Sequence, residues 1–144
     1  MDVGDIRVGL AGAVRDRIPS LNCFGYVPDS VPEPCFYAGE VDITFDRTFG
    51  RGLDEIEVTC RLLVSRADDR AGQAALDRYL AGSGPRSIKA ALVAARGAPG
   101  EHALGGLCDD LHLMRVQAYR MYQVGEHHYY GAELIVRVIG SGKG

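Results

Sequence analysis

The cysteines and histidines are the residues of this chain best suited to metal or redox chemistry, but their spacing matches no site of that kind. No two of the four cysteines form the C-x-x-C pair of a zinc or redox motif; they are Cys23, Cys35, Cys60 and Cys108. His127 and His128 are adjacent, and adjacent strand residues face opposite ways, so they would not share one metal. His102 and His112 complete the histidines and suggest no ligand set either. We therefore expect buried, reduced and metal-free thiols.

The paired carboxylates are explained by structure better than by catalysis. Two pairs lie at the boundaries of predicted elements, where a carboxylate caps a helix or starts a strand; they are Asp68 with Asp69 and Asp109 with Asp110. Glu55 and Glu57 share one strand face, which favours a solvated or interface face over a chelating site. No nucleophile, base and orienting group occur together. The glycine-containing stretch GRGLDE precedes a strand and not a helix, so it is not a phosphate-binding loop. We predict no catalytic, cofactor-binding or metal residue, and no enzyme.

The bulk composition describes one ordinary domain. The chain has 144 residues, a net charge of -3 and 24% charged residues, which suits a single globular domain over 1–140 with a short tail at 141–144. A protein that grips nucleic acid through phosphates usually has a basic excess, so such binding is not expected as its main role. No apolar run approaches 18 residues and the first ten residues are not basic. We therefore expect no membrane span, no signal peptide and synthesis in the cytosol.

The stretch 41–66 has the alternation of two strands joined by a loop. The first strand alternates apolar Val41, Ile43 and Phe45 with polar residues. Only Leu63 interrupts the alternation of the second strand. Successive strand side chains point to opposite faces, so this stretch is predicted to be an antiparallel hairpin at the heart of a sheet. The apolar residues of the second strand that share one parity are Ile56, Val58, Cys60, Leu62 and Val64.

Helices are predicted on both sides of this hairpin. Residues 2–18 place apolar side chains on one stripe, with Asp2 as a cap and Pro19 as the end. After the hairpin, one helix ends near Gly82 and a second short helix covers 86–95. The residues predicted to face inward from these two helices are Ala75, Leu76, Tyr79, Leu80, Ile88, Ala91, Leu92 and Ala95.

The remaining segments complete the sheet. A short strand over 22–27 leads into a proline-rich connector, and a second hairpin pairs 110–124 with 128–139. A shared parity is predicted for Met114, Val116, Ala118, Tyr122 and Val124. Arg120 is the exception, which a bulge or a local salt bridge near it would explain. The predicted fold is α+β: a single antiparallel or mixed sheet of about four to five strands, with an N-terminal helix and two central helices packed mostly on one face.

Two features suggest contact with other subunits. By parity, the outward face of the last strand carries Tyr129, Ile135 and Ile139, joined by Leu63, and several apolar side chains on one sheet face favour cover by another subunit. The loop from Asp46 to Asp54 holds an aromatic flanked by arginines, a composition enriched at interfaces. The predicted interface residues are Arg47, Thr48, Phe49, Arg51, Asp54, Tyr129 and Ile135.

Four stretches of sequence stand out beyond this pattern. They are YVPDSVPEPC, FDRTFGRGLDE, LLVSRADDRAGQAALDRYLAGSGPRSIKAAL and YYGAELIVRVIG, spread over most of the chain. Together they resemble the tail terminator, or tail completion, proteins of long-tailed phages that infect actinobacteria. The resemblance implies a compact α/β fold and six copies in a ring at the head-proximal end of the tail tube. It transfers no catalytic motif and no cofactor.

The resemblance also implies partners and a location. Such a ring ends tube polymerisation and contacts the tail tube protein on one side and a head–tail connector or stopper protein on the other. DNA passes through its channel without specific binding, which suits a mildly acidic chain. The protein would belong to the neck region of the virion tail, and to the host cytoplasm during assembly. The alternatives are another connector or stopper ring, or a small cytosolic enzyme or ligand-binding domain.

Overall fold

A computed structural model describes residues 1–45, 52–65, 69–98 and 100–141 of the chain. The elements follow the predicted order of one helix, strands, two helices and two strands. They are α1 (Val3–Arg17), β1 (Asn22–Phe24), β2 (Cys35–Thr44), β3 (Leu53–Ser65), α2 (Asp69–Leu80), α3 (Ile88–Arg96), a 3₁₀ turn η1 (Leu104–Gly106), β4 (Asp110–Val124) and β5 (His127–Ser141).

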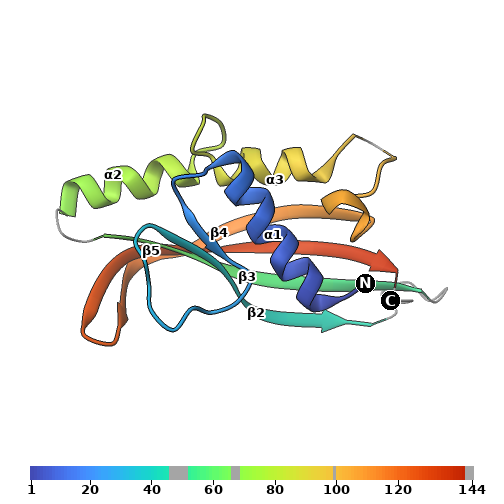
Figure 1. The fold of residues 1–144 in the computed structure, drawn as a ribbon, viewed down its shortest axis with the longest axis horizontal. Helices are drawn as coiled ribbons and strands as arrows, with labels where there is room; N and C mark the ends of the chain where they lie inside the picture. The colour runs from blue at the N-terminus through green and yellow to red at the C-terminus, as the bar shows by residue number, and fades with distance from the viewer. Residues whose placement is uncertain (46–51, 66–68, 99, 142–144) are drawn as a thin grey trace.

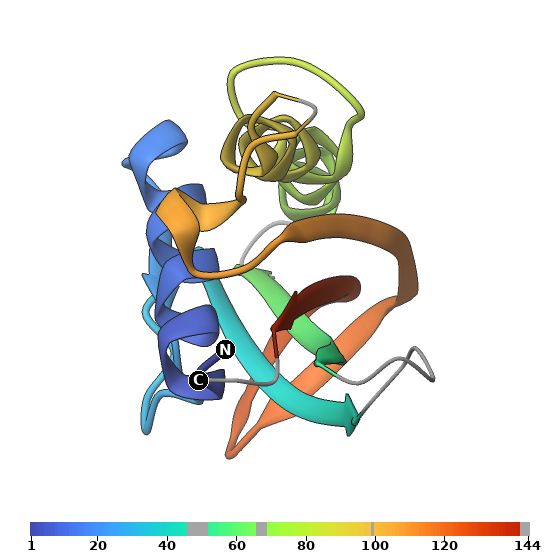
Figure 2. The same cartoon turned by 90° about the vertical axis from the view of Figure 1, so that its right-hand side faces the viewer.

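The strands form one five-stranded mixed sheet in the order β1-β2-β3-β5-β4. Only β1 and β2 are parallel; the other neighbours are antiparallel. The three helices lie on one face of this sheet, as the two views show (Figure 1, Figure 2). The predicted α+β fold is therefore confirmed, including both hairpins and the position of the helices.

The first helix forms for the reasons that its sequence suggests. The Asp2 carboxylate accepts a hydrogen bond of 2.9 Å from the backbone N–H of Asp5, which satisfies one of the free donors at the helix start. Ile6, Leu10 and Val14 are fully buried against the sheet. Burial of such a side chain stabilises the fold by roughly 1.5–3 kcal/mol, so this stripe holds α1 on the sheet.

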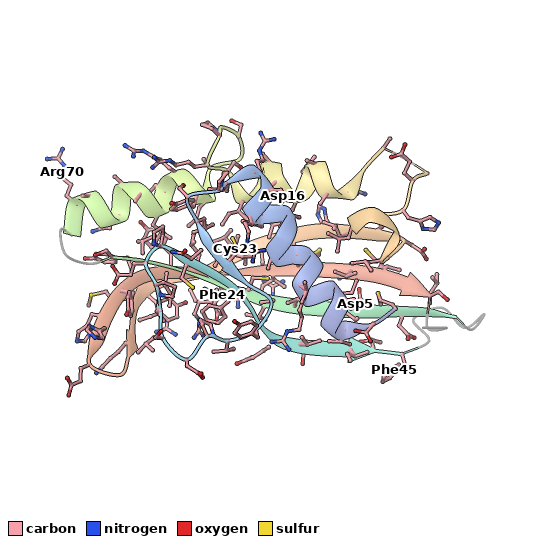
Figure 3. All side chains as sticks on the ribbon, viewed as in Figure 1. Asp5, Asp16, Cys23, Phe24, Phe45 and Arg70 are labelled. Carbon is pink, nitrogen blue, oxygen red and sulfur yellow. The ribbon has the colours of Figure 1, made fainter. Side chains whose placement is uncertain are left out.

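The alternation of β3 and β5 is confirmed in the core. All five alternating residues of β3 are at most 2% exposed, from Ile56 to Val64. The outer end of β2 differs from the prediction, since Ile43 is 40% and Phe45 is 70% exposed. Phe45 lies beyond the last residue of β2 and projects from the end of the strand, so no helix covers it (Figure 3).

The parity predicted for β4 is wrong over most of its length. Met114, Val116 and Val124 are exposed, whereas Leu111 is buried. The reason is a pair of register shifts against β5, one between Leu113 and Arg115 and one between Gln117 and Arg120. Each shift changes the face to which the following residues point. The second shift lies next to Arg120, so of the two explanations offered for that residue the structure has the bulge.

A second apolar cluster lies on the sheet face opposite the helices and corrects another expectation. Leu63 is fully buried there and Tyr129 is 4% exposed, although both were predicted to be outward-facing apolar residues. Phe24, at the end of β1, and Val31, within the proline-rich connector, pack against this cluster. Ile135, also predicted to be exposed, is only 2% exposed. The chain covers these side chains itself, so they call for no second subunit.

Candidate interaction surfaces

The cysteine thiols of this fold are not poised for chemistry. All four are buried and free. Burial raises the pKa of Cys23 and Cys60 to about 12 and that of Cys35 and Cys108 to about 11. The thiolate is the nucleophile and the metal ligand, so these neutral thiols are poor at both tasks near neutral pH.

Of the two acidic pairs, Asp109 and Asp110 each contact a basic side chain, and Asp68 lies outside the described residues. Asp110 receives two hydrogen bonds from the Arg96 guanidinium, at 2.7 and 3.0 Å. Hydrogen bonding to Arg96 is the main reason why the pKa of the Asp110 carboxyl is lowered. His102 Nδ1 lies 3.1 Å from Asp109 Oδ1. These contacts tie the end of α3 and the following loop to the start of β4, where capping had been predicted. Across the described ranges, no three metal-ligating side chains come together.

The residues predicted to make contacts with other subunits lie partly in the loop after β2 and partly in β3 and β5. Arg47, Thr48, Phe49 and Arg51 lie outside the described residues. Asp54 is part of β3 and pairs with Gly140 of β5 at the end of the first hairpin.

Tyr129 and Ile135 are described, but their surroundings remove the reason for proposing them. Tyr129 pairs with Ser65 at the opposite end of β3 from Asp54, so the fold does not bring these two predicted residues together. Ile135 pairs with Thr59 of β3 and Arg115 of β4 in the interior of the sheet. Since both side chains are nearly inaccessible, they offer little surface to a partner.

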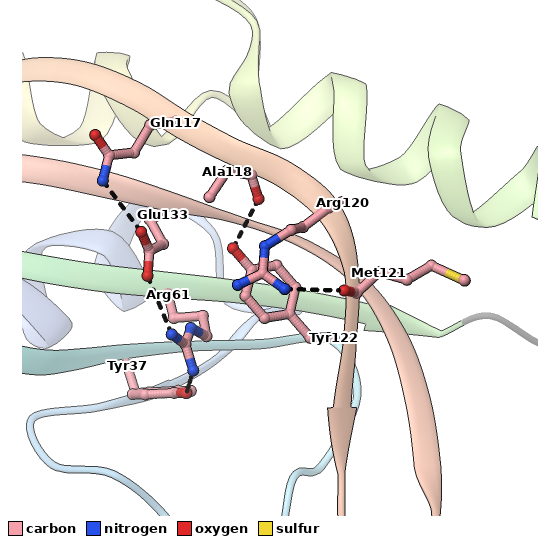
Figure 4. Close-up of polar contacts among 8 residues, drawn as sticks. All are labelled: Tyr37, Arg61, Gln117, Ala118, Arg120, Met121, Tyr122 and Glu133. Atoms are coloured by element: carbon pink, nitrogen blue, oxygen red, sulfur yellow. Dashed lines mark hydrogen bonds and ion pairs between the residues drawn. The ribbon is translucent and has the colours of Figure 1, made fainter.

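A polar network crosses four strands on the face opposite the helices (Figure 4). The Arg61 guanidinium donates to Glu133 Oε2 at 3.0 Å and to the Tyr37 hydroxyl at 3.4 Å. Gln117 donates to the other carboxylate oxygen of Glu133 at 3.1 Å. These hydrogen bonds, Gln117 first and then Arg61, hold the pKa of Glu133 below its ordinary value. The network joins β2, β3, β5 and β4 through one carboxylate.

The ring of Tyr122 anchors the bulge of β4 beside this network. Its hydroxyl donates to the Ala118 carbonyl at 2.7 Å, inside the shifted segment. The guanidinium carbons of Arg61 and Arg120 lie 4.8 and 4.2 Å from the ring centroid, within the range of cation–π attraction. The arrangement holds the backbone in place and presents no reactive group.

The outer edge of β4 is the surface that the sequence pattern missed. β4 is the last strand of the sheet, and over 15 residues no strand of the described chain pairs with its outer side. Its exposed apolar residues are Met114, Val116, Tyr119, Met121 and Val124, each between 36% and 45% exposed. Tyr119 also donates from its hydroxyl to Asp77 of α2 at 2.7 Å. We call this surface the β4 edge.

The opposite side of the sheet has a second open edge. β1 pairs with β2 only from Cys35 to Tyr37. From Ala38 to Thr44, β2 has a partner on its inner side and none on its outer side among the described strands. Glu40 and Asp42 are exposed there. We call this surface the β2 edge.

A shallow groove lies between α1, α3 and η1. It has a volume of about 880 Å³ and is lined largely by glycine and alanine. Asp16, Arg17, Glu101 and His102 stand at its rim. None of these polar groups is buried, so the groove has no built site for a ligand.

Comparison with known proteins adds no identity to this geometry. No protein-family model matches the chain, and no curated protein matches it. Among the described residues, none of the helices is long and apolar enough to cross a membrane.

Proposed function

We propose that this chain is a tail terminator of a long-tailed phage, forming a ring of six copies on the head-proximal end of the tail tube. The ring ends tube polymerisation and offers its other side to the head connector or stopper. The observation that carries the proposal is the β4 edge, an open strand lined with apolar side chains. The sequence resemblance supplies the setting.

An edge of this kind favours assembly. The unpaired N–H and C=O groups of a long edge strand are a template for another chain. β4 spans 15 residues and exposes apolar side chains at its middle and at its end. A subunit with an open edge on each side of its sheet can join its neighbours head to tail, and contacts of that type form a ring when the rotation from one subunit to the next closes.

The charge of the chain suits a passage for DNA. The net charge is -3, so a ring of these subunits carries no basic excess that would hold phosphates. The polar network around Arg61 and Glu133 mixes both signs of charge on the face opposite the helices. Such a protein belongs to the neck of the virion tail after its assembly in the host cytoplasm.

Imaging tests this proposal directly. We expect negative-stain images of the protein on tail tubes to show a ring with a pore wide enough for double-stranded DNA, at the head-proximal end only. A phage lacking the gene should produce tails of uncontrolled length that do not join heads. A stable dimer that appears on no phage particle would refute the proposal.

The alternatives give other results in the same experiments. A connector or stopper would appear on the head portal, and its loss would leave tails of normal length. A small enzyme or ligand-binding domain would appear on no particle and would bind a metabolite in solution.

The loop from Asp46 to Asp54 remains a predicted contact for this ring. We expect Phe49→Ala, or Arg47→Glu combined with Arg51→Glu, to leave the melting temperature unchanged and to block ring closure or docking on the tube. Thermal melting and tail imaging of the same variants measure both effects. If melting falls by several degrees, roughly 1 kcal/mol, while tails stay normal, the loop serves the fold instead.

A further inference from the structure

The β4 edge and the β2 edge carry opposite charges. Between Leu111 and Val124, β4 contains Arg115 and Arg120 and no acidic residue. Between Ala38 and Thr44, β2 contains Glu40 and Asp42 and no basic residue. Charges of opposite sign on two surfaces favour their contact and disfavour the contact of each surface with its own copy. The chain therefore has two complementary edges on opposite sides of one sheet.

These charges have few partners inside the subunit. Arg115 donates from Nε to Gln117 Oε1 at 3.0 Å, and within the described residues it makes no ion pair. Glu40 and Asp42 make no side-chain hydrogen bond or ion pair within the same residues. Both acids and Arg115 are exposed. Their charges are thus available to a second molecule.

The pairing register places the charges at matching heights on the two edges. Asp42 pairs with Glu57, Glu57 with Arg137, and Arg137 with His112. Asp42 and His112 are therefore the two ends of one row across the sheet.

A second row joins the other acid to an arginine. Arg115 pairs with Ile135, and Ile135 with Thr59. Thr59 lies opposite the register shift of β2 between Ala38 and Val41, which contains Glu40. Two rows, separated by the row of Val58 and Val136, thus end in an acid on the β2 edge and in a basic or hydrogen-bonding side chain on the β4 edge.

Strand direction also suits the contact. β2 and β5 run one way and β3 and β4 run the other, because each neighbouring pair is antiparallel. A neighbour related by rotation about an axis roughly along the strands keeps its own strand directions. Its β2 then meets the first copy's β4 in antiparallel orientation, which is the more stable form of pairing. On the other face of the strands, Ile43 of the β2 edge adds an exposed apolar side chain.

We propose that a second copy of this chain covers the β4 edge with its β2 edge, in antiparallel orientation, so that Arg115 faces Glu40 and His112 faces Asp42. The contact is heterologous, since each copy uses a different edge toward each neighbour. Closure of these contacts into a ring rests on the proposed function, but the contact between two copies can be tested without the ring.

Disulfide trapping between two single-cysteine variants tests the contact. Glu40→Cys and Arg115→Cys are prepared separately, mixed in equal amounts at high concentration and oxidised mildly. The native cysteines are buried and do not interfere. Within one chain the two edges are about 14 Å apart along the sheet, three strand spacings, too far for an internal disulfide. The mixed disulfide should exceed its share from random pairing, and neither variant should dimerise readily by itself.

Other outcomes are equally informative. A statistical mixture of the three disulfides would overturn the proposal. Preferred trapping of Glu40→Cys by Arg120→Cys would keep the two edges as the contact but overturn the facing of Arg115 and Glu40. Lys89→Cys, at an exposed position of α3, is the matched control and should give no preferred pair.

A charge exchange provides an independent check. With Asp42→Cys and His112→Cys as the reporter pair, adding Arg115→Glu to the second variant should slow trapping about tenfold. Adding Glu40→Arg to the first variant should restore the rate, because the two charges are then exchanged. Lys89→Glu in place of Arg115→Glu should leave the rate unchanged. No restoration by the exchange would overturn the pairing of Arg115 with Glu40.

Failure of this contact and failure of the proposed function are distinguishable. Rings on tail tubes together with random trapping would reject the edge contact and keep the terminator. Preferred trapping without rings on any particle would keep the contact and reject the terminator.

Discussion

Arg61 and Glu133 stand 72 positions apart in the chain, and their side chains meet at 3.0 Å across β3 and β5. Glu133 is also the acceptor for Gln117, so one carboxylate joins both hairpins of the sheet. Its side chain is only 17% exposed. An ion pair in that position contributes more to the stability of the fold than an ion pair in open solvent does.

Glu133→Gln should therefore destabilise the fold. The substitution keeps the shape of the side chain but removes the charge opposite the half-buried Arg61, and we expect a loss of about 1–2 kcal/mol. Denaturant unfolding measures it. Glu126→Gln, in the exposed turn between β4 and β5, is the matched control and should change little. Equal stability of the two variants would show that the network adds nothing to the fold.

The same carboxylate predicts a dependence on pH. The hydrogen bonds of Glu133 hold its folded-state pKa below the ordinary 4.5, so folding favours its ionised form. That stabilisation is complete above the unfolded pKa and disappears as pH falls through the folded pKa. The stability gap between wild type and Glu133→Gln should thus stay constant above the unfolded pKa of 4.5 and shrink as the pH falls below it. A gap that grows toward acid would contradict the sign of this shift.

Two glycines should respond in opposite ways to alanine. A Cβ at Gly131 would lie 2.5 Å from the Leu62 carbonyl oxygen and 2.7 Å from Leu63 Cδ2, so Gly131→Ala should cost about 1–3 kcal/mol. A Cβ at Gly12 in α1 would meet nothing within 4 Å. Gly12→Ala should stabilise by roughly 0.5–1 kcal/mol through helix propensity. Thermal melting of both variants checks the close packing of β5 on β3.

The thiols should be slow to react in the native protein. Raised pKa values and burial keep Cys23 and Cys60 neutral and covered. A chromogenic thiol reagent should label them slowly at neutral pH, and all four cysteines quickly after denaturation. Elemental analysis should find no stoichiometric zinc. Fast labelling of a native cysteine would show that the core opens near that residue.

Local patterns predicted the fold well where the strands are regular. The alternation of β3 from Ile56 to Val64 was enough, because one face of a regular strand is buried along its whole length. The direction of the side chains of β4 was not predictable in the same way. Its two register shifts depend on the partner strand β5, and nothing local identifies Met114 as the extra residue.

Exposed apolar side chains were predicted on β5, but the structure has them on β4, for a related reason. Strand parity alone predicts an exposed Tyr129, but Phe24 and Val31 come from a distant part of the chain and pack against its cluster. Conversely, Val116 and Met121 were not recognised as surface residues, because whether a strand is an edge depends on the order of all strands. The loop residues from Arg47 to Arg51 remain a prediction.

The order of the strands also has a consequence for how the chain folds. The hairpins β2–β3 and β4–β5 each pair neighbouring segments, whereas the seam between β3 and β5 joins distant ones. Closing a long loop costs chain entropy before its contacts form, so the seam should set the folding rate. During synthesis β3 leaves the ribosome well before β5 does, and its inner edge stays open in that interval. The edge that is most protected in the finished subunit is thus the one most exposed to wrong pairing in the nascent chain.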